Sequence, residues 1–364
     1  MFGRKPDFDR LLKVLWREGE PDKIPYYEHF VDHEMIEAII RRSLPRPALA
    51  SRDAADKRET VEYLRGLVYF YSKLGYDYIP LELPISLARK TVATRDTAYL
   101  NRGLRTWQDE HRGIIETRED FEAYPWPDPE EAVNLSVLDL LQTLLPSEMK
   151  VVSGVGGGVL EHVMWMMGTV PFCMALYRDP RLVKDMFMKV GSLIYEVDKA
   201  IADHGCVGAL RMGDDMGYRK GTMVAPSILR KYVFPWQKKC ADLAHRAGMP
   251  FILHSCGNLE AVMEDLINYV GIDAKHSFED AIMPVWEAKR LYGDKIAILG
   301  GVDVDKLARL NETSLRKYVR KILKLCAPGG GYALGSGNTI TNYVKPENYL
   351  AMLEEGEKYS KHIL

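Results

Sequence analysis

The sequence alternates short apolar segments with helix-like patterns eight times, and this regularity constrains the fold more than any other feature. Turn-forming residues bound these segments, which are Ile24–Phe30, Tyr76–Leu83, Lys150–Gly156, Val207–Asp215, Pro250–Gly257, Gly271–Glu279, Lys295–Asp303 and Gly331–Asn338. Such runs are typical of buried strands, and strands that alternate with helices pair in parallel. Eight units predict an α/β fold, a closed (β/α)8 or TIM barrel, with an open doubly wound sheet as the alternative.

Glycines at the ends of the predicted helices support this division of the chain. Gly248, Gly271 and Gly293 each follow a helical pattern just before the next strand, as helix-terminating glycines do. The segment 84–149 is polar, rich in aromatic residues and longer than most connections, so we expect it to be an insertion. No stretch has the composition of a linker, and residues 1–364 are therefore predicted to form a single domain.

Composition and charge exclude several classes of function. The 364 residues are 47% hydrophobic and 27% charged with a net charge of -2, which is ordinary for a globular enzyme. This balance gives no reason to expect a nucleic acid or an anionic membrane as partner. No apolar run approaches the roughly 18 residues of a membrane span, and the first residues lack the apolar core of a secretory signal. For the five cysteines we expect free thiols and a cytoplasmic location.

Ionisable and polar side chains gather at the C-terminal ends of the predicted strands, where (β/α)8 barrels place their active sites. These residues are Glu28, His29, Glu82, Asp214, Asp215, His254, Cys256, His276, Glu279, Asp303 and Asn338. A single aspartate after a strand often caps the next helix instead. The shared position of the whole group at one end of the barrel nevertheless predicts an active site.

His254 and Cys256 are the sharpest candidates, because strand residues two positions apart project to the same side. An imidazole and a thiolate placed together suit a metal ion such as zinc. Catalytic zinc needs a third ligand. We expect it among four carboxylates and one histidine, which are Asp214, Glu82, Asp215, Glu161 and His276. Asp214 and Glu82 are slightly favoured. The remaining cysteines are excluded, since they lie at the opposite end of the barrel or in its outer helices: Cys206, Cys326, Cys173 and Cys240.

The chain resembles the uroporphyrinogen decarboxylase superfamily over nearly its whole length. The resemblance is carried by the stretches RLLKVLWREGEPDKIPYYEHF, YSKLGYDYIPLEL, TREDFEAYPWPDPEE, GDDMGYRKGTMVAPSILRKYVFPW, FILHSCGNLE, AILGGVDVDKL and GGYALGSGNTITNYVKPENYLAML. It implies a (β/α)8 barrel of the uroporphyrinogen decarboxylase type. It also implies one of two chemistries, the decarboxylation of a tetrapyrrole or a corrinoid-dependent methyl transfer.

The decarboxylase branch matches this sequence poorly at its anion-binding positions. Its members carry an Arg-Gln-Ala-Gly-Arg stretch after the first strand, where this chain has Tyr26–Phe30, whose acidic and aromatic character would repel a polycarboxylate. Their aspartate on the second strand corresponds to Glu82 here. Their Leu-Gly-His-Gly corresponds to Leu334–Gly337, which has a serine in place of the histidine.

The methyltransferase branch matches better, because its coenzyme M members bind zinc through a His-x-Cys sequence like that of His254 and Cys256. Their later zinc cysteine is replaced here by the stretch Ser336–Asn338. A site with one thiolate is a harder Lewis acid, which favours an O- or N-methyl substrate, such as a methoxylated aromatic compound, over a thiol. The resemblance also implies cobalamin carried by a corrinoid protein that docks at the barrel mouth.

These observations together predict a corrinoid-dependent methyltransferase, or demethylase, with zinc on His254 and Cys256. Three carboxylates are expected either to complete the coordination of zinc or to supply a proton to the leaving group: Asp214, Asp215 and Glu82. Contacts with the small-molecule methyl donor or acceptor are assigned to Tyr26, Glu28, His29, His276 and Asn338. An aromatic lining is a further candidate, although core packing explains its members equally well: Tyr26, Tyr27, Phe30 and Trp107.

Three alternatives remain open at the level of the sequence. A decarboxylase would need positive charge from elsewhere, for which the candidates are Arg102, Arg105, Arg112 and Arg219. A metal-free member would use His254 and Cys256 only as hydrogen-bonding groups. Methyl transfer to a thiol would need a softer site than Asn338 provides. The methyl substrate, the metal, the corrinoid partner and the oligomeric state, including a homodimer, also stay open.

Overall fold

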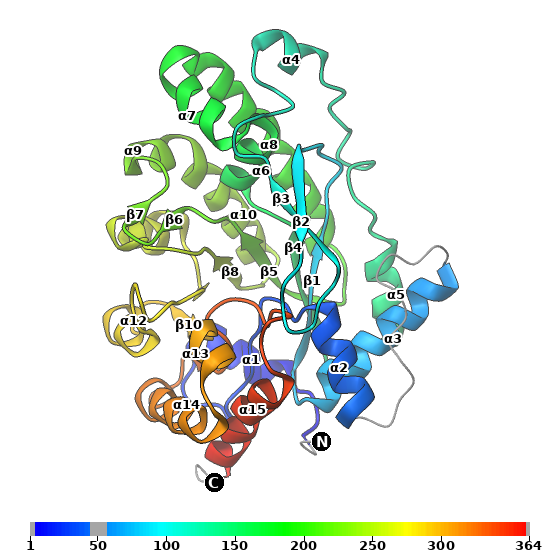
Figure 1. Ribbon diagram of the computed structural model, residues 1–364, viewed down its shortest axis with the longest axis vertical. Helices are drawn as coiled ribbons and strands as arrows, with labels where there is room; N and C mark the ends of the chain where they lie inside the picture. The colour runs from blue at the N-terminus through cyan, green and yellow to red at the C-terminus, as the bar shows by residue number, and fades with distance from the viewer. Residues whose placement is uncertain (1–3, 44–56, 362–364) are drawn as a thin grey trace.

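The computed structural model describes residues 4–43 and 57–361, and a curled parallel sheet of seven strands lies at its centre (Figure 1). Its strands follow one another around the sheet in the order of the chain: β1 (Tyr78–Leu83), β4 (Lys150–Val155), β5 (Val207–Gly213), β8 (Phe251–His254), β9 (Ala274–His276), β10 (Ala297–Leu299) and β11 (Tyr332–Ala333). Each strand matches one of the predicted apolar segments, and their parallel pairing confirms the predicted α/β barrel type.

The first predicted strand, Ile24–Phe30, is not a regular strand, and this part of the prediction was wrong. The segment lies beside β11 through isolated bridges, with Tyr26 opposite Leu334. On the side of β1, the hydroxyl of Tyr78 takes the place of main-chain hydrogen bonds between strands. It accepts from the Glu28 N–H at 2.8 Å and donates to the Glu28 carbonyl at 2.7 Å. Pro25 removes one main-chain donor as well. A side chain therefore completes the ring where main-chain pairing is absent.

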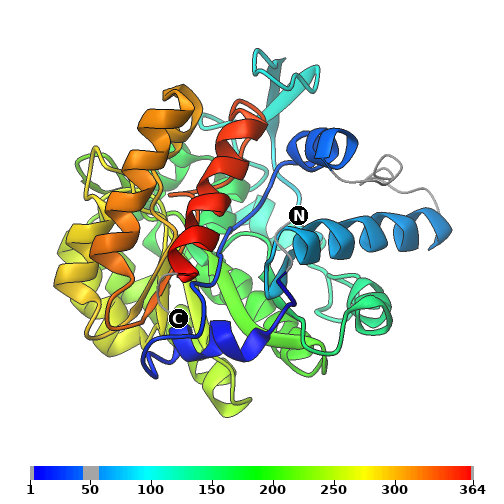
Figure 2. The ribbon, with the colours of Figure 1, turned by 90° about the horizontal axis from the view of Figure 1, so that it is seen from below.

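Helices surround the sheet on its outer side (Figures 1 and 2). Those before β1 are α1 (Phe8–Leu15), α2 (His33–Ser43) and α3 (Lys57–Lys73). Those between β4 and β8 are α6 (Val159–Met167), α7 (Thr169–Arg178), α8 (Pro180–Ala202), α9 (Pro226–Ile228), η1 (Leu229–Val233) and α10 (Phe234–Arg246). The remainder are η2 (Glu260–Val262), α11 (Met263–Asp265), η3 (Leu266–Val270), α12 (Val285–Tyr292), α13 (Val304–Arg309), α14 (Glu312–Cys326) and α15 (Pro346–Ser360).

Two of the three predicted helix-terminating glycines have the conformation expected of them. Gly248 and Gly271 have φ values of +71° and +80°, in the left-handed region that L side chains rarely adopt. Gly293 differs, because it ends α12 with a φ of -67°. A Cβ there would instead lie 2.4 Å from the carbonyl oxygen of Lys289, so close packing explains the glycine.

The segment 84–149, predicted to be an insertion, forms separate small elements between β1 and β4. These are the antiparallel hairpin of β2 (Thr91–Arg95) and β3 (Leu104–Gln108), followed by α4 (Arg118–Ala123) and α5 (Ser136–Leu144). The hairpin projects from the rest of the molecule (Figure 2), and every residue of β2 is exposed. A second short hairpin, β6 (Gly217–Tyr218) and β7 (Gly221–Thr222), follows β5.

Within residues 4–43 and 57–361, no single helix is long and apolar enough to cross a bilayer. The adjacent helices α6 and α7 reach the required length and composition only together, and a bend of 95° separates them.

Candidate metal centre

The ends of β5, β8 and β9 bring the central residues of the site to the same level of the sheet. Gly213 pairs with His254, and His254 pairs with His276 on the next strand. Because adjacent parallel strands point paired residues to the same side, the two imidazoles face the inside of the barrel together. Asp215 and Cys256 each follow two residues after the paired position, at the mouth.

A chain of hydrogen bonds fixes which nitrogen of His254 carries a hydrogen. The Nε2 atom of His276 lies 3.1 Å from the carbonyl oxygen of Ser336, which can only accept, so that nitrogen carries the hydrogen. Burial lowers the pKa of His276 to about 3, so its ring is neutral and its Nδ1 is an acceptor. The Nδ1 of His254, 2.8 Å away, must then donate. His254 Nε2 is left with a free lone pair.

The lone pair of His254 points toward a thiol and a carboxylate. His254 Nε2 lies 3.5 Å from Cys256 Sγ and 3.9 Å from Asp215 Oδ1, and the three ligand atoms all lie within 4.8 Å of one another. Burial also lowers the pKa of His254, which keeps this ring neutral too. A tetrahedral zinc ion with nitrogen and sulfur ligands would separate those two atoms by about 3.5 Å.

Hydrogen bonds hold the carboxylate and the thiol of this group in place. Asp215 Oδ1 accepts from the main-chain N–H of Cys256 at 2.7 Å. The Sγ of Cys256 accepts hydrogen bonds from the side-chain amide of Asn338 at 3.2 Å and from the hydroxyl of Ser277 at 3.5 Å. Burial, with the negative charge of Asp215, raises the pKa of the Cys256 thiol, which is the response that a bound cation would reverse.

Asp215 is the third member of this group, whereas the sequence favoured Asp214 or Glu82 as the third ligand. Asp214 turns away from the mouth and caps α6, where it accepts from the main-chain N–H groups of Val159, Leu160 and Glu161. The amide of Gln237 also donates to it, at 2.9 Å. Asp214 is therefore tied to the helix terminus rather than to His254.

The glycines after β4 make this cap feasible. A Cβ added at Gly158 would lie 2.1 Å from the Cβ of Asp214, so only glycine leaves room for the carboxylate at the helix end. Glycines let another group approach the main chain closely. At Gly158 the group that approaches is the side chain of Asp214.

His29 and Glu82 form a second group beside the first. The ring of His29 stacks on that of His254, with centroids 3.8 Å apart and an interplanar angle of 13°. Its Nε2 lies 3.4 Å from Glu82 Oε1, which is also 3.4 Å from the guanidinium of Arg211. This group braces the ring of His254 from the inside of the barrel.

His29, His254 and His276 also lie close enough together to form a three-histidine group. A metal ion in this group would need free lone pairs on its nitrogen atoms. The Nδ1 atoms of His254 and His276, however, share a hydrogen bond at 2.8 Å. The hydrogen between them removes one of these lone pairs. The group of Asp215, His254 and Cys256 therefore fits a cation better.

Glu161 is a further carboxyl group at the mouth, in the first turn of α6. Burial raises its pKa well above the usual range of a glutamate, and the charges of Asp215 and Asp214 raise it further. Its carboxylate oxygen accepts from the N–H of Gly158 at 3.4 Å. The sequence placed Glu161 among the candidate ligands, but burial and the neighbouring carboxylates favour its protonated form.

Two residues predicted to bind substrate lie deeper in the fold. Glu28 is fully buried and accepts from the N–H and the hydroxyl of Ser336, while burial raises its pKa to about 8. The hydroxyl of Tyr26 donates to the carbonyl of Leu353 in α15, at 2.8 Å. Neither side chain reaches Cys256, so both support the walls of the site.

The aromatic residues proposed to line a pocket do not form one surface. Tyr27 is fully buried, and its ring packs edge-on against His276 at 5.1 Å. Phe30 lies beneath the guanidinium of Arg211. Trp107 is on the projecting hairpin and is half exposed. Core packing therefore explains Tyr27, which was the alternative that the sequence left open for these residues.

Arg211 and Lys275 were missed by the sequence analysis. Both are charged residues inside buried strands, Arg211 in VGALRMG and Lys275 in AKH, and both side chains are buried. Arg211 donates to the carbonyl of His29 at 2.6 Å. A charge in the middle of a buried strand was the available signal, because such a position is costly unless the charge has partners.

Known proteins resemble this chain at three levels. The uroporphyrinogen decarboxylase (URO-D) family matches residues 111–359. A uroporphyrinogen decarboxylase from Methylococcus capsulatus is 25% identical over 188 residues, 51% of each protein, so the match spans about half the length of that relative. A methyltransferase from Methanosarcina mazei is 14% identical with a TM-score of 0.70, covering 96% of this chain and 98% of that one, which shows a shared fold. By the extent of the family match, this chain belongs to the uroporphyrinogen decarboxylase family.

Proposed function

We propose that this protein is an enzyme that moves a methyl group between a small O- or N-methylated substrate and the corrinoid of a partner protein. The substrate would be a compound such as a methoxylated aromatic. Asp215, His254 and Cys256 would hold a zinc ion. One observation carries the proposal. The hydrogen-bond chain through His276 directs the Nε2 lone pair of His254 at a thiol and a carboxylate.

The ligand set fits zinc in a catalytic rather than a structural role. One imidazole, one thiolate and one carboxylate make three protein ligands and leave a fourth position open at the mouth. When bound there, zinc would polarise the heteroatom of the substrate and make it a better leaving group. Asn338 and Ser277 both donate to Cys256 Sγ, which weakens its electron donation and favours an oxygen or nitrogen substrate.

The side chains around the ligands supply positioning and a proton. His29 stacks on His254 and prevents the ring from turning out of the ligand plane. Burial and the charges of Asp215 and Asp214 favour the protonated form of Glu161, which is proposed to give its proton to the departing oxygen or nitrogen. The methyl group leaves through the open mouth, where the corrinoid partner is proposed to dock.

Decarboxylation of a tetrapyrrole receives less support, because two of its four candidate anion-binding arginines already have carboxylate partners. Arg102 pairs with Asp32 and Glu34, and Arg105 pairs with Asp96 at 3.3 Å. A polycarboxylate would have to displace these carboxylates. Arg112 and Arg219 are exposed.

The experiment that tests the proposal supplies zinc-loaded protein with free cob(I)alamin and a panel of methoxylated aromatic acids. Formation of methylcobalamin is followed by its absorbance. We expect zinc-dependent methyl transfer with at least one donor and a loss of about 100-fold or more in Cys256→Ala. Metal-independent release of carbon dioxide from a porphyrinogen, without methyl transfer from any donor, would contradict the proposal.

A further inference from the structure

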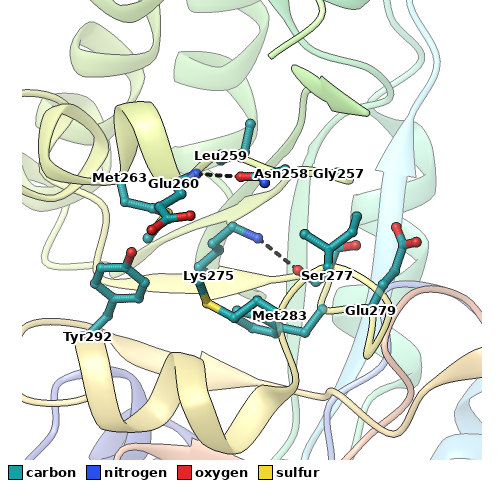
Figure 3. A pocket seen from close by; sticks show the side chains of 12 residues that line it. Gly257, Asn258, Leu259, Glu260, Met263, Lys275, Ser277, Glu279, Met283 and Tyr292 are labelled. Atoms are coloured by element: carbon teal, nitrogen blue, oxygen red, sulfur yellow. Dashed lines mark hydrogen bonds between the residues drawn. The ribbon is translucent and has the colours of Figure 1, made fainter. Parts of the chain in front are cut away.

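Lys275 is a buried lysine whose ammonium group is used entirely by main-chain oxygens. It lies on β9 directly before His276, so its side chain points to the outer face of the sheet, and it is 4% exposed. Its Nζ donates to the carbonyls of Ser255 and His276, each at 3.2 Å, and of Ser277 at 2.8 Å. Three donors therefore meet three acceptors, the last of which is drawn in Figure 3.

The three carbonyls belong to the two turns that carry the site. Ser255 stands between His254 and Cys256 after β8, and His276 and Ser277 end β9. By bonding to both turns, Lys275 fixes the distance between them. Without the ammonium, the buried carbonyls of Ser255 and Ser277 would lose this donor, and the carbonyl of His276 would keep only the N–H of Ser255 at 3.3 Å.

Ser277 shows that this arrangement constrains the main chain. Its φ of +83° lies in the left-handed region, which residues other than glycine adopt rarely. In this conformation its carbonyl accepts from Lys275 while its hydroxyl lies 3.5 Å from Cys256 Sγ. Both contacts converge on the turn that holds the thiol.

A small cavity lies beside Lys275 on the outer face of the sheet (Figure 3). Its volume is about 30 Å³, which is about the space of one water molecule in the liquid, and Met263, Met283 and Tyr292 are among its lining residues. Lys275 and Ser277 also line it.

The charge of Lys275 has no carboxylate in direct contact. In the described part of the chain it forms no ion pair within 4 Å, and the anionic groups that act on it are Cys256, Asp215 and Glu279. A buried charge is stable only when opposite charge lies near it. Asp215 and Glu279 supply that charge in the metal-free protein, and Cys256 adds to it when a bound cation makes it a thiolate.

We propose that Lys275 is a positioning residue, whose ammonium joins the turns after β8 and β9 and so sets the place and the electron donation of the Cys256 sulfur. Its role as a clamp stands on the contacts of the metal-free protein. Its effect on metal binding rests on the proposed function above.

Two measurements on the full-length protein separate these parts. The first is hydrogen exchange of the metal-free protein, in peptides that cover residues 254–258 and 276–279. In Lys275→Met we expect exchange to rise about 10-fold or more at both turns together, because both lose hydrogen bonds to the same group. In the control Lys289→Met both turns should keep their protection, although Lys289 also donates to a main-chain carbonyl, that of Gly330 at 2.6 Å.

The second measurement is the absorption spectrum with cobalt(II) in place of zinc. We expect a sulfur-to-cobalt charge-transfer band in the native protein and in Lys289→Met, and a weaker, shifted band in Lys275→Met, with affinity lower by about 10-fold or more. Ser277→Ala, which keeps its carbonyl, should shift the band and leave exchange unchanged.

Each outcome decides one of the two claims. If the native protein takes up no cobalt, the proposed function fails, and the exchange data still decide whether Lys275 is a clamp. Unchanged exchange at both turns in a folded Lys275→Met protein would overturn the inference. Should that variant not fold, Lys275→Gln, which keeps two N–H donors without the charge, takes its place in both measurements.

Discussion

His254 and His276 face each other through their Nδ1 atoms at a distance of 2.8 Å, on neighbouring strands at the mouth of the barrel. This contact can form only if one ring donates and the other accepts. The carbonyl of Ser336, at the far side of His276, decides which ring does so. A main-chain oxygen after β11 thereby sets the tautomer of a candidate metal ligand on β8, three strands away.

Removing the acceptor from His276 is expected to weaken zinc binding. His276→Leu leaves His254 free to place its hydrogen on Nε2, so zinc affinity should fall about 10- to 100-fold in a competition with a chromophoric chelator. His276→Asn, whose amide oxygen can take the place of Nδ1, should recover part of the loss. His204→Leu, before β5 at the opposite end of the barrel, is the matched control. An unchanged affinity in His276→Leu would refute the tautomer argument.

The adjacent residues Asp214 and Asp215 are expected to separate stability from metal binding. Asp214→Asn replaces a carboxylate that accepts from three N–H groups of α6, and should lower the free energy of unfolding by about 1–3 kcal/mol. Zinc stoichiometry should remain. Asp215→Asn should do the reverse, with weaker zinc binding and little change in the unfolding of the metal-free protein. Urea denaturation and zinc titration of both variants give the answer, and equal effects in the two would contradict the assignment.

The pH dependence of methyl transfer tests the role of Glu161. Its pKa is raised by burial and by Asp215 and Asp214, so its proton is lost only as the pH rises through that elevated value. If Glu161 gives the proton, the rate falls on this alkaline side. Glu161→Gln keeps the hydrogen-bond acceptor for Gly158 but has no proton to give, so kcat should fall about 100-fold and lose the alkaline decline. The exposed Glu260→Gln is the control, and a retained alkaline decline in Glu161→Gln would exclude this residue.

Asp198, buried in α8, is expected to make stability depend on pH. Its Oδ1 accepts from the Val155 N–H at 3.1 Å, and burial raises its pKa to about 7. The unfolded value is about 3.9, so the folded protein holds this proton more tightly, and the resulting stability is complete below about pH 4 and lost as the pH rises through about 7.

The variant Asp198→Asn keeps an oxygen acceptor and cannot ionise. The native protein loses stability as the pH rises through about 7, and this variant should not. The stability of Asp198→Asn relative to the native protein, measured by urea denaturation, should therefore be greater at about pH 8 than at about pH 5. Asp203→Asn, at the exposed end of the same helix, should show no such change. A difference between Asp198→Asn and the native protein that stays constant with pH would show that Asp198 does not titrate in this range.

Much of the fold follows from local patterns in the sequence. Apolar runs between helical segments located seven strands, because burial on both faces of a parallel sheet requires such runs. The segment at Ile24–Phe30 has the same composition, yet it forms only isolated bridges. Its pairing depends on the hydroxyl of Tyr78, some fifty positions away, and no local pattern reveals such a contact.

The candidate site was predictable in its place but not in its details. The period of a strand was enough to put His254 and Cys256 together, and the barrel rule put carboxylates near them. The choice between Asp214 and Asp215 required the position of α6, whose free N–H groups bind the first. Lys275 was missed because its partners are main-chain carbonyls, which any sequence provides.

The zinc content of purified protein, native and Cys256→Ala, tests the central claim most directly. The account predicts about one zinc per chain in the native protein after zinc is supplied, and less than about a tenth of that in the variant. Stoichiometric zinc in Cys256→Ala, or none in the native protein, would contradict it.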